Sequence, residues 1–140
     1  MLVMSAIQLK FFFDLNRAHA VLSRRFDAEL GSVHGLGLGD LQLLWALEQA
    51  PDGRLRRVDL AHQLGVTPSG VTWTLRPLMK RGLVASEASE TDARVAFAVL
   101  TPAGRQLVAD AVPSARRLAA TLIEKGAVEK VGDALARLAG

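Results

Sequence analysis

Residues 66–82 combine hydroxyl groups, an indole ring and positive charges in a segment with the marks of a helix. Thr67 and Pro68 are typical of a helix start, and Gly82 is typical of a helix end. At about 100° per residue, one side is apolar and is predicted to be buried: Val71, Leu75 and Leu78. The opposite side carries polar and aromatic residues: Ser69, Thr72, Trp73, Arg76 and Lys80. Hydrogen-bonding groups that end in positive charge suit a polyanion, and a merely solvated helix face is the alternative interpretation.

Basic residues concentrate in the same part of the chain, although the whole sequence has a formal net charge of only +3. Residues 54–82 contain six basic residues against a single acidic residue, Asp59: Arg54, Arg56, Arg57, Arg76, Lys80 and Arg81. A local basic patch of this kind indicates a polyanionic partner.

Several classes of protein are excluded because the residues that they require are missing or lie far apart in the sequence. The sequence contains no cysteine, which excludes disulfides, thiolate metal sites and thiol redox switches. His19, His34 and His62 have no histidine partner at i, i+4, so we expect no metal site. The glycines of residues 31–40 follow no strand and do not match a dinucleotide-binding loop. Without a His–carboxylate cluster either, we expect no cofactor and no enzymatic activity.

The apolar segments are all too short to cross a membrane. None reaches the roughly 18 residues that a bilayer requires, and the first sixteen residues do not resemble a signal peptide. We therefore expect a cytoplasmic protein with no membrane partner.

The elements expected around the opening segment are mostly helical. In order, they are helices over 4–30, 41–50 and 58–64, the helix from Pro68, a hairpin of 83–85 and 95–100, and helices over 102–125 and 128–139. Gly126 is the expected break between the last two helices. The order of the middle elements predicts a winged helix-turn-helix: a helix, a short helix, a tight turn at Gly65, a helix and a hairpin.

The predicted fold class is therefore mainly α with a small β-hairpin wing, a winged helix-turn-helix plus a helical dimerisation arm. Residues 35–101 are expected to form the winged DNA-binding domain, and residues 1–34 and 102–140 the helical dimerisation region. The second helix of such a pair enters the major groove with its N-terminal residues nearest the base edges.

This geometry assigns a contact to each exposed group of the opening segment. Ser69, Thr72 and Arg76 are expected to contact bases, and Lys80 and Arg81 the phosphate backbone. The helix start at Thr67 and Pro68 attracts phosphate by itself. Trp73 could stack on a sugar or a thymine methyl, line a ligand pocket or pack against its neighbours, and Trp45 is expected in the core.

The sequence resembles the MarR family of bacterial transcriptional regulators over nearly its whole length. The resemblance rests on "LQLLWAL", "DLAHQLGVTPSGVT", "LMKRGLV", "TDAR" and "LTPAGRQL", which follow the family's order and spacing. It implies a homodimer joined through the first and last helices, which binds a palindromic operator in double-stranded DNA. It also implies a small phenolic or other aromatic effector. Asp92 would shape the wing, and Arg94 would reach the minor groove.

The sequence departs from the family pattern at four places. Trp73 stands where an Arg is frequent, and Ser86 stands where an Arg would pair with the wing Asp. The wing is acidic, which predicts a small contribution to DNA affinity: Glu87, Glu90 and Asp92. Arg56 stands at a usual Ser or Thr cap position, which predicts a phosphate contact instead.

The first helix carries more apolar surface than its own fold can cover. Ile7, Phe11, Phe12 and Leu15 are expected in a dimer interface, because large apolar patches mark interaction surfaces. Any effector is expected in the crevice between the arm and the winged domain. The function predicted is a sequence-specific DNA-binding regulator, a repressor released by its effector. The alternative is a winged-helix module that binds protein and has lost DNA affinity.

Overall fold

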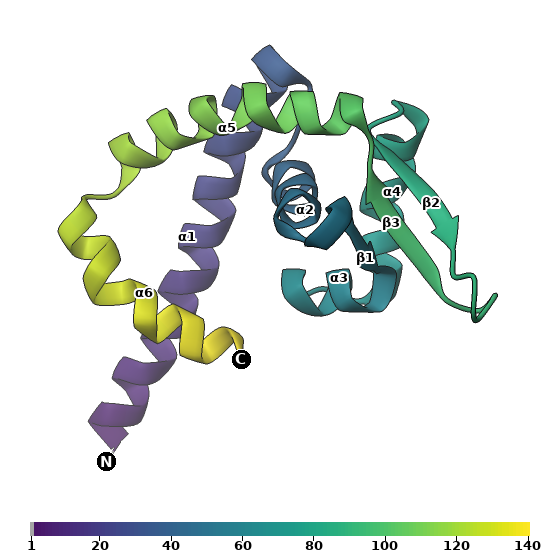
Figure 1. Cartoon of the computed structure of the whole chain (residues 1–140). Helices are drawn as coiled ribbons and strands as arrows, with labels where there is room; N and C mark the ends of the chain where they lie inside the picture. Colours follow the sequence, from purple (N-terminus) through teal and green to yellow (C-terminus); the bar gives the residue numbers. More distant parts are fainter. Residues whose placement is uncertain (1) are drawn as a thin grey trace.

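The computed structural model describes residues 2–140, which form a small sheet and a set of helices. In chain order the elements are α1 (Leu2–His34), α2 (Leu38–Gln49), a 3₁₀ turn (Pro51–Gly53), β1 (Arg54–Arg56), α3 (Arg57–Leu64), α4 (Pro68–Lys80), β2 (Val84–Ala88), β3 (Ala96–Leu100), α5 (Pro102–Leu122) and α6 (Lys125–Ala139). Figure 1 shows α2, α3, α4 and the strands gathered on one side, while α1 and α6 extend away on the other. The helix α5 runs across the top and joins the two parts. This architecture confirms the predicted fold, mainly α with a small hairpin wing and a helical arm, and the dimerising role of the arm stays a prediction.

Hydroxyl caps fix the starts of α4 and α5. The hydroxyl of Thr67 accepts a hydrogen bond from the amide of Gly70 at 3.1 Å, and Pro68 follows as the first helical residue. Thr101 accepts in the same way from the amide of Gly104 at 3.0 Å. Each cap satisfies a backbone donor that the first helical turn leaves unpaired, so both predicted helix starts are confirmed.

The sheet has three antiparallel strands in the order β1-β3-β2. The predicted hairpin is β2 with β3, in which Ser86 pairs with Ala98. The strand β1 was not predicted, and it pairs with β3 through Arg54 opposite Val99 and Arg56 opposite Phe97. Three residues are too few to give a periodic signal in the sequence, which is why β1 was not predicted. The strand forms because β3 offers it an edge with which to pair.

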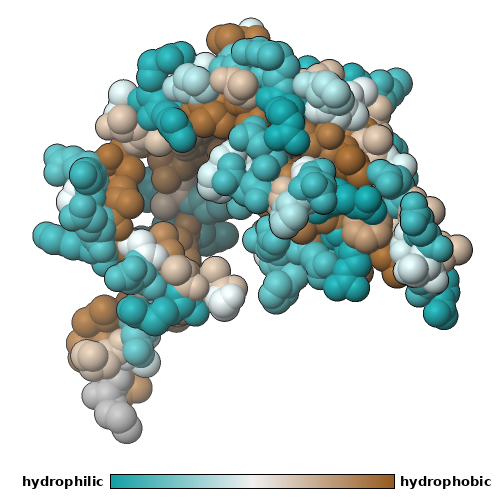
Figure 2. All heavy atoms as spheres, in the orientation of Figure 1, coloured by the Kyte–Doolittle hydropathy of each residue, from teal (hydrophilic) through white to brown (hydrophobic). Residues whose placement is uncertain are grey.

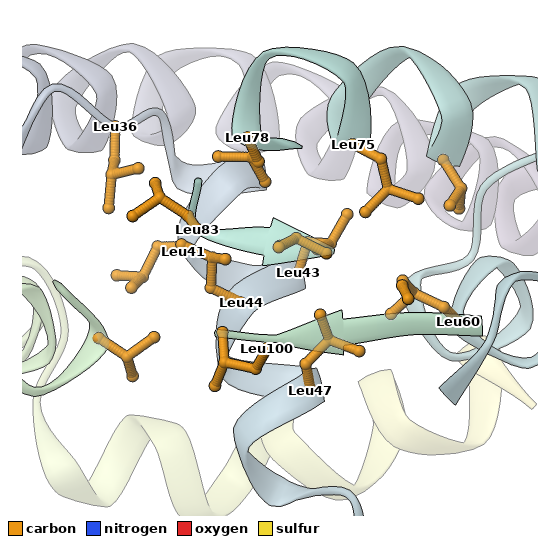
Figure 3. Packing of buried hydrophobic residues seen from close by; sticks show 14 of the residues in the cluster. Leu36, Leu41, Leu43, Leu44, Leu47, Leu60, Leu75, Leu78, Leu83 and Leu100 are labelled. Carbon is orange, nitrogen blue, oxygen red and sulfur yellow. The ribbon is translucent and has the colours of Figure 1, made fainter. Parts of the chain in front are cut away.

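The core lies where α2, α4 and the sheet meet. Leu43, Leu44 and Leu47 of α2 are fully buried, as is Leu75 of α4. Figure 3 shows Leu75 and Leu78 pointing from α4 toward the leucines of α2 and the strands. Because this face of α4 is held inside, its opposite face must point away from the protein.

Several predicted helix boundaries were wrong, and α2 begins at Leu38 rather than at Leu41. The first helix continues beyond Leu30 to His34, because buried Leu30 and a 2.9 Å hydrogen bond between His34 Nε2 and Ser114 Oγ hold its last turn on α5. Gly35, with φ of 67°, then ends it. The break near the C-terminus lies at Ile123, which is extended (φ −148°, ψ 137°), and Gly126 lies inside α6.

Trp45 was expected in the core, and that prediction was wrong. Its side chain is 48% exposed, whereas the leucines on either side of it in α2 are buried. Trp45 is two residues from both Leu43 and Leu47, so it lies about 200° around the helix from each. The core therefore holds the leucines, and the indole faces the crevice beside α5.

The apolar side chains of α1 and α6 remain largely uncovered. Ile7, Phe11, Phe12 and Leu15 are between 36% and 60% exposed. Figure 2 shows brown, apolar side chains gathered along the extension that α1 and α6 form, which we call the arm. Among the helices of residues 2–140, none is both long enough and apolar enough to span a bilayer.

Candidate nucleic-acid interface

The outward face of α4 carries most of the side chains that the sequence singled out. Ser69, Trp73, Arg76 and Lys80 are exposed, whereas Val71, Leu75 and Leu78 are at most 2% exposed. Thr72 lies at the margin, partly buried, and its hydroxyl donates to the carbonyl of Pro68 at 3.2 Å. The predicted division into buried and outward faces is therefore confirmed.

Trp73 and Arg76 lie together on this face. The indole of Trp73 is 72% exposed, and the guanidinium carbon of Arg76 lies 5.6 Å from the centre of its ring. This distance is within the range of a cation–π contact. Trp73 therefore does not pack into the protein, and it does not line the crevice beside Trp45.

The N-terminus of α4 adds positive potential to the same face. Thr67 and Pro68 are exposed, and the helix begins at Pro68 with Thr67 as its cap. A helix N-terminus carries a partial positive charge and unpaired amide donors, which favour a phosphate. The hydroxyl of Thr67 is already used as the cap, so its backbone position rather than its side chain contributes to this potential.

The basic residues before α3 are held by neighbouring side chains. Arg56 Nε donates to Asp59 Oδ2 at 2.8 Å and its NH2 group donates to Oδ1 at 3.2 Å. The hydrogen bond to Asp59 raises the pKa of Arg56 above its ordinary value, with a further contribution from the charge of Asp59. A phosphate contact at Arg56 would thus share the guanidinium with Asp59.

Arg57 links α3 to the wing, which the sequence did not predict. Its guanidinium donates to the hydroxyl of Ser86 at 3.2 Å, while its Nε is buried without a hydrogen-bond partner in the described residues. Ser86 stands where the family pattern has an Arg, and the positive charge at this junction comes from α3 instead. The short side chain of Ser86 was the available signal, since it leaves room for a partner from another element.

Arg81 lies at the end of α4 and contacts α1. Its guanidinium donates to the carbonyl of Gly35 at 2.9 Å and to that of His34 at 3.4 Å. These bonds join the end of α4 to the end of α1, so the side chain is directed toward the helix junction rather than along the outward face. Lys80, the preceding residue, is exposed.

Asp92 organises the turn of the wing. Its Oδ1 accepts hydrogen bonds from the backbone amide of Arg94 at 3.0 Å and from Arg94 Nε at 3.2 Å. These bonds lower the pKa of Asp92 below its ordinary value, the backbone bond contributing most. The side chain of Arg94 remains 92% exposed at the wing tip.

The wing is less acidic in effect than its composition suggests. Arg54 lies 3.4 Å from a carboxylate oxygen of Glu87, and Arg94 lies 3.2 Å from that of Asp92. Each pair partly offsets a negative charge that would otherwise repel phosphate. Arg54 also stacks over the ring of Phe97 at 4.1 Å, which holds it beside β3.

A second concave site lies between α1, α2 and α5. The cavity has a volume of about 460 Å³ and is largely apolar, with Phe26, Trp45 and Val112 in its walls. Gln42 and Arg116 supply polar groups. The exposed indole of Trp45 is thus one wall of this crevice, and within residues 2–140 no cluster of His, Asp or Glu could hold a metal ion.

Comparisons with known proteins find the same fold in solved structures of transcriptional regulators. Residues 34–95 match the model of the MarR family. The fold is similar to that of the transcriptional regulator BldR from Sulfolobus solfataricus (24% identity, 93% of this chain and 95% of that one, TM-score 0.80). It is similar to Sco3205 from Streptomyces coelicolor, a MarR family regulator solved in complex with DNA (24%, 96% and 86%, TM-score 0.80).

A further similar structure describes a ligand-regulated protein. Bordetella bronchiseptica BpsR, whose DNA binding is regulated by 6-hydroxynicotinic acid, is 22% identical over 94% of this chain and 99% of that one, with a TM-score of 0.80. At these identities the likenesses establish the fold. The comparison with curated proteins found no match.

Proposed function

We propose that this chain is a member of the MarR family of transcriptional regulators, and that it binds a palindromic operator as a homodimer and represses transcription until a small aromatic effector releases it. The family consists of regulators rather than enzymes, which agrees with the expectation from the sequence. The finer parts of this proposal rest on three features: the outward face of α4, the arm and the crevice.

The outward face of α4 is the observation that carries DNA binding. Its helix is fixed to the core by one face, and the other presents hydroxyl, indole, guanidinium and ammonium groups to solvent. The major groove, about 12 Å wide, accepts such a helix, and Arg reads guanine there. We assign base contacts to Ser69, Thr72 and Arg76, and phosphate contacts to Lys80, the start of α4 and, shared with Asp59, Arg56. Arg81 is left out because two carbonyls already hold its guanidinium.

The wing completes the proposed DNA surface. Asp92 shapes its turn and holds Arg94 through its Nε, and the Arg94 side chain remains exposed at the wing tip, where it can enter the narrower minor groove. The nearby carboxylates keep this contribution small.

The exposed apolar side chains of the arm support a homodimer. Ile7, Phe11 and Phe12 line a groove with Leu138 of α6, so α1 and α6 offer one continuous apolar surface to a second copy. A two-fold dimer would place two α4 helices on half-sites about 34–36 Å apart, which matches a palindrome.

The crevice beside Trp45 supports an aromatic effector. Its volume suits a small ring, Phe26 and Trp45 can stack on it, and Arg116 can pair with an anionic substituent. Because α1 and α5 form one wall and α2 the other, a ligand here would alter the angle between the arm and the winged part. A change of a few ångströms in the separation of the two α4 helices would then break register with one half-site.

Binding to a random duplex over a range of salt concentrations tests the DNA-binding part. The logarithm of the affinity should fall linearly with the logarithm of salt, with a slope of about −0.9 per phosphate contact. The Lys80→Ala variant, which removes a proposed phosphate contact, should show a shallower slope. A protein with no salt-dependent duplex binding would instead be the protein-binding module.

The effector is tested by the fluorescence of Trp45. The sequence contains two tryptophans, so the Trp73→Phe variant leaves Trp45 as the sole indole. Titration of this variant with 6-hydroxynicotinic acid or benzoate should quench its fluorescence. The same concentrations should release labelled operator from the wild-type protein. Quenching without release would show a ligand site that does not control DNA binding.

A further inference from the structure

The centre of the outward face of α4 is an aromatic side chain paired with a cation. At about 100° per residue, Ser69, Trp73, Arg76 and Lys80 fall within an arc of about 60°. Trp73 is the one large apolar residue of this arc, and its exposure of 72% means that the fold gives it little cover. Trp and Arg are the residue types that most often carry binding energy at an interface.

The contact between Arg76 and Trp73 restricts the position of the guanidinium. With its carbon 5.6 Å from the ring centre, Arg76 is held along the helix face rather than free in solvent. A guanidinium that is already ordered loses less entropy when it donates two hydrogen bonds to one base. Thr72, the neighbouring candidate, directs its hydroxyl back to the carbonyl of Pro68. The two ordered outward groups at the centre are therefore the indole and the guanidinium.

These two groups match two features of the major groove. Its apolar feature is the C5-methyl group of thymine, and its best partner for Arg is the O6 and N7 pair of guanine. Residues three apart in a helix are separated by about 4.5 Å along the axis, which is close to one base-pair step of about 3.4 Å. This spacing allows the two contacts to fall on neighbouring base pairs.

We propose that Trp73 and Arg76 act as one specificity unit, in which the indole contacts a thymine methyl and the guanidinium reads the adjacent guanine in each half-site. The inference rests on the proposed function, since it requires α4 to enter the major groove. It assigns to Trp73 a base-reading role, in place of packing on a sugar, which would carry no preference for a methyl group.

Selection from a randomised duplex library by the full-length protein provides the operator for the test. Each thymine of the selected sequence is then replaced by deoxyuridine, which lacks only the methyl group, and each guanine by 7-deazaguanine, which lacks N7. One thymine per half-site should be sensitive, with an affinity loss of about fourfold per half-site, the equivalent of about 0.8 kcal/mol for one buried carbon. The sensitive guanine should be its neighbour.

Variants separate the two contacts. Trp73→Ala should bind the thymine and deoxyuridine operators equally, while Trp73→Phe should keep part of the difference because its ring can still contact the methyl. Arg76→Ala should bind the guanine and 7-deazaguanine operators equally. Far-UV circular dichroism should be unchanged in all three, since both side chains are exposed.

The outcomes distinguish this inference from the proposed function. If the wild type bound its operator tightly and its affinity did not change on loss of any thymine methyl, the inference would be overturned and the proposed function would stand. Equal methyl sensitivity in wild type and Trp73→Ala would also overturn it, because another side chain would then contact the methyl. If no duplex were bound at all, both would fail together.

Discussion

Gly104 lies where the wing, the core and α5 meet, and replacing it with alanine should destabilise the protein. It is buried in the first turn of α5, and its amide donates to the Thr101 hydroxyl at 3.0 Å. A Cβ atom built on Gly104 would overlap the carbonyl oxygen of Leu83 and lie 2.7 Å from Leu100 Cδ1. That carbonyl also accepts a hydrogen bond from the amide of Thr101 at 3.1 Å. A backbone atom cannot rotate away as a side chain can, so α5 must shift.

The expected loss follows from three opposing contributions. Overpacking of a filled site costs about 1–3 kcal/mol, and weakening the Thr101 to Leu83 hydrogen bond costs about 1 kcal/mol. The better helix propensity of alanine returns about 0.5–1 kcal/mol. Gly104→Ala should therefore lower the free energy of unfolding by about 2–3 kcal/mol. With a urea m-value of about 2 kcal/mol/M, the unfolding midpoint should fall by about 1–1.5 M.

Urea unfolding followed by far-UV circular dichroism measures this shift. All variants must be compared at one protein concentration, because the stability of a dimer depends on it. Gly39→Ala is the matched control: Gly39 is exposed in the first turn of α2, and nothing lies within 4 Å of its added Cβ. Its midpoint should stay constant or rise slightly.

Similar midpoints for the Gly104→Ala and Gly39→Ala proteins would refute the reasoning. They would mean that α5 can move off the wing junction at little cost. The proposed transmission from the crevice to α4 would then lose its rigid connection, since α5 joins the arm to the winged part.

The remaining predictions concern the DNA surface, the arm and the wing. Arg76→Ala should relax discrimination at one base pair in each half-site at a cost of about 1–3 kcal/mol. Lys80→Ala should weaken binding to the operator and to a scrambled duplex equally and reduce the salt slope by about 1. If Arg76→Ala lowered the affinity for both duplexes equally, Arg76 would contact only the phosphate backbone. Phe12→Glu should dissociate or unfold the protein, and a dimer that persists at micromolar concentration in sedimentation would place the interface elsewhere. The Asp92 carboxylate has a lowered pKa, so its stabilisation of the wing should be present above the usual aspartate pKa of about 3.9 and lost as pH falls through the lowered value. Arg94→Ala should raise that pKa only part of the way toward its usual value in an NMR titration, because the backbone amide of residue 94 still donates to Asp92, and it should cause only a mild loss of DNA affinity. An unchanged pKa would contradict the side-chain hydrogen bond from Arg94 Nε.

Local patterns in the sequence were enough to predict the helix that carries the site. The Thr-Pro start of α4 and its apolar residues at helical spacing involve only residues within a few turns of each other. Such signals act through short-range backbone geometry, and they hold whatever the rest of the chain does. The same is true of the start of α5 at Thr101 and of the wing hairpin. The side chains on the outward face of α4 could therefore be identified before their surroundings were known.

Contacts between distant segments decided the rest. The strand β1 forms because β3 offers it an edge more than 35 residues later in the sequence, and Trp45 is exposed because α5 leaves a crevice beside it. Arg57 reaches Ser86, and Arg81 reaches the end of α1, across separations of 29 and 46 residues. A single sequence shows that such side chains are charged or aromatic. Which partner each one meets depends on how the core orients whole elements, and only the tertiary structure determines that orientation.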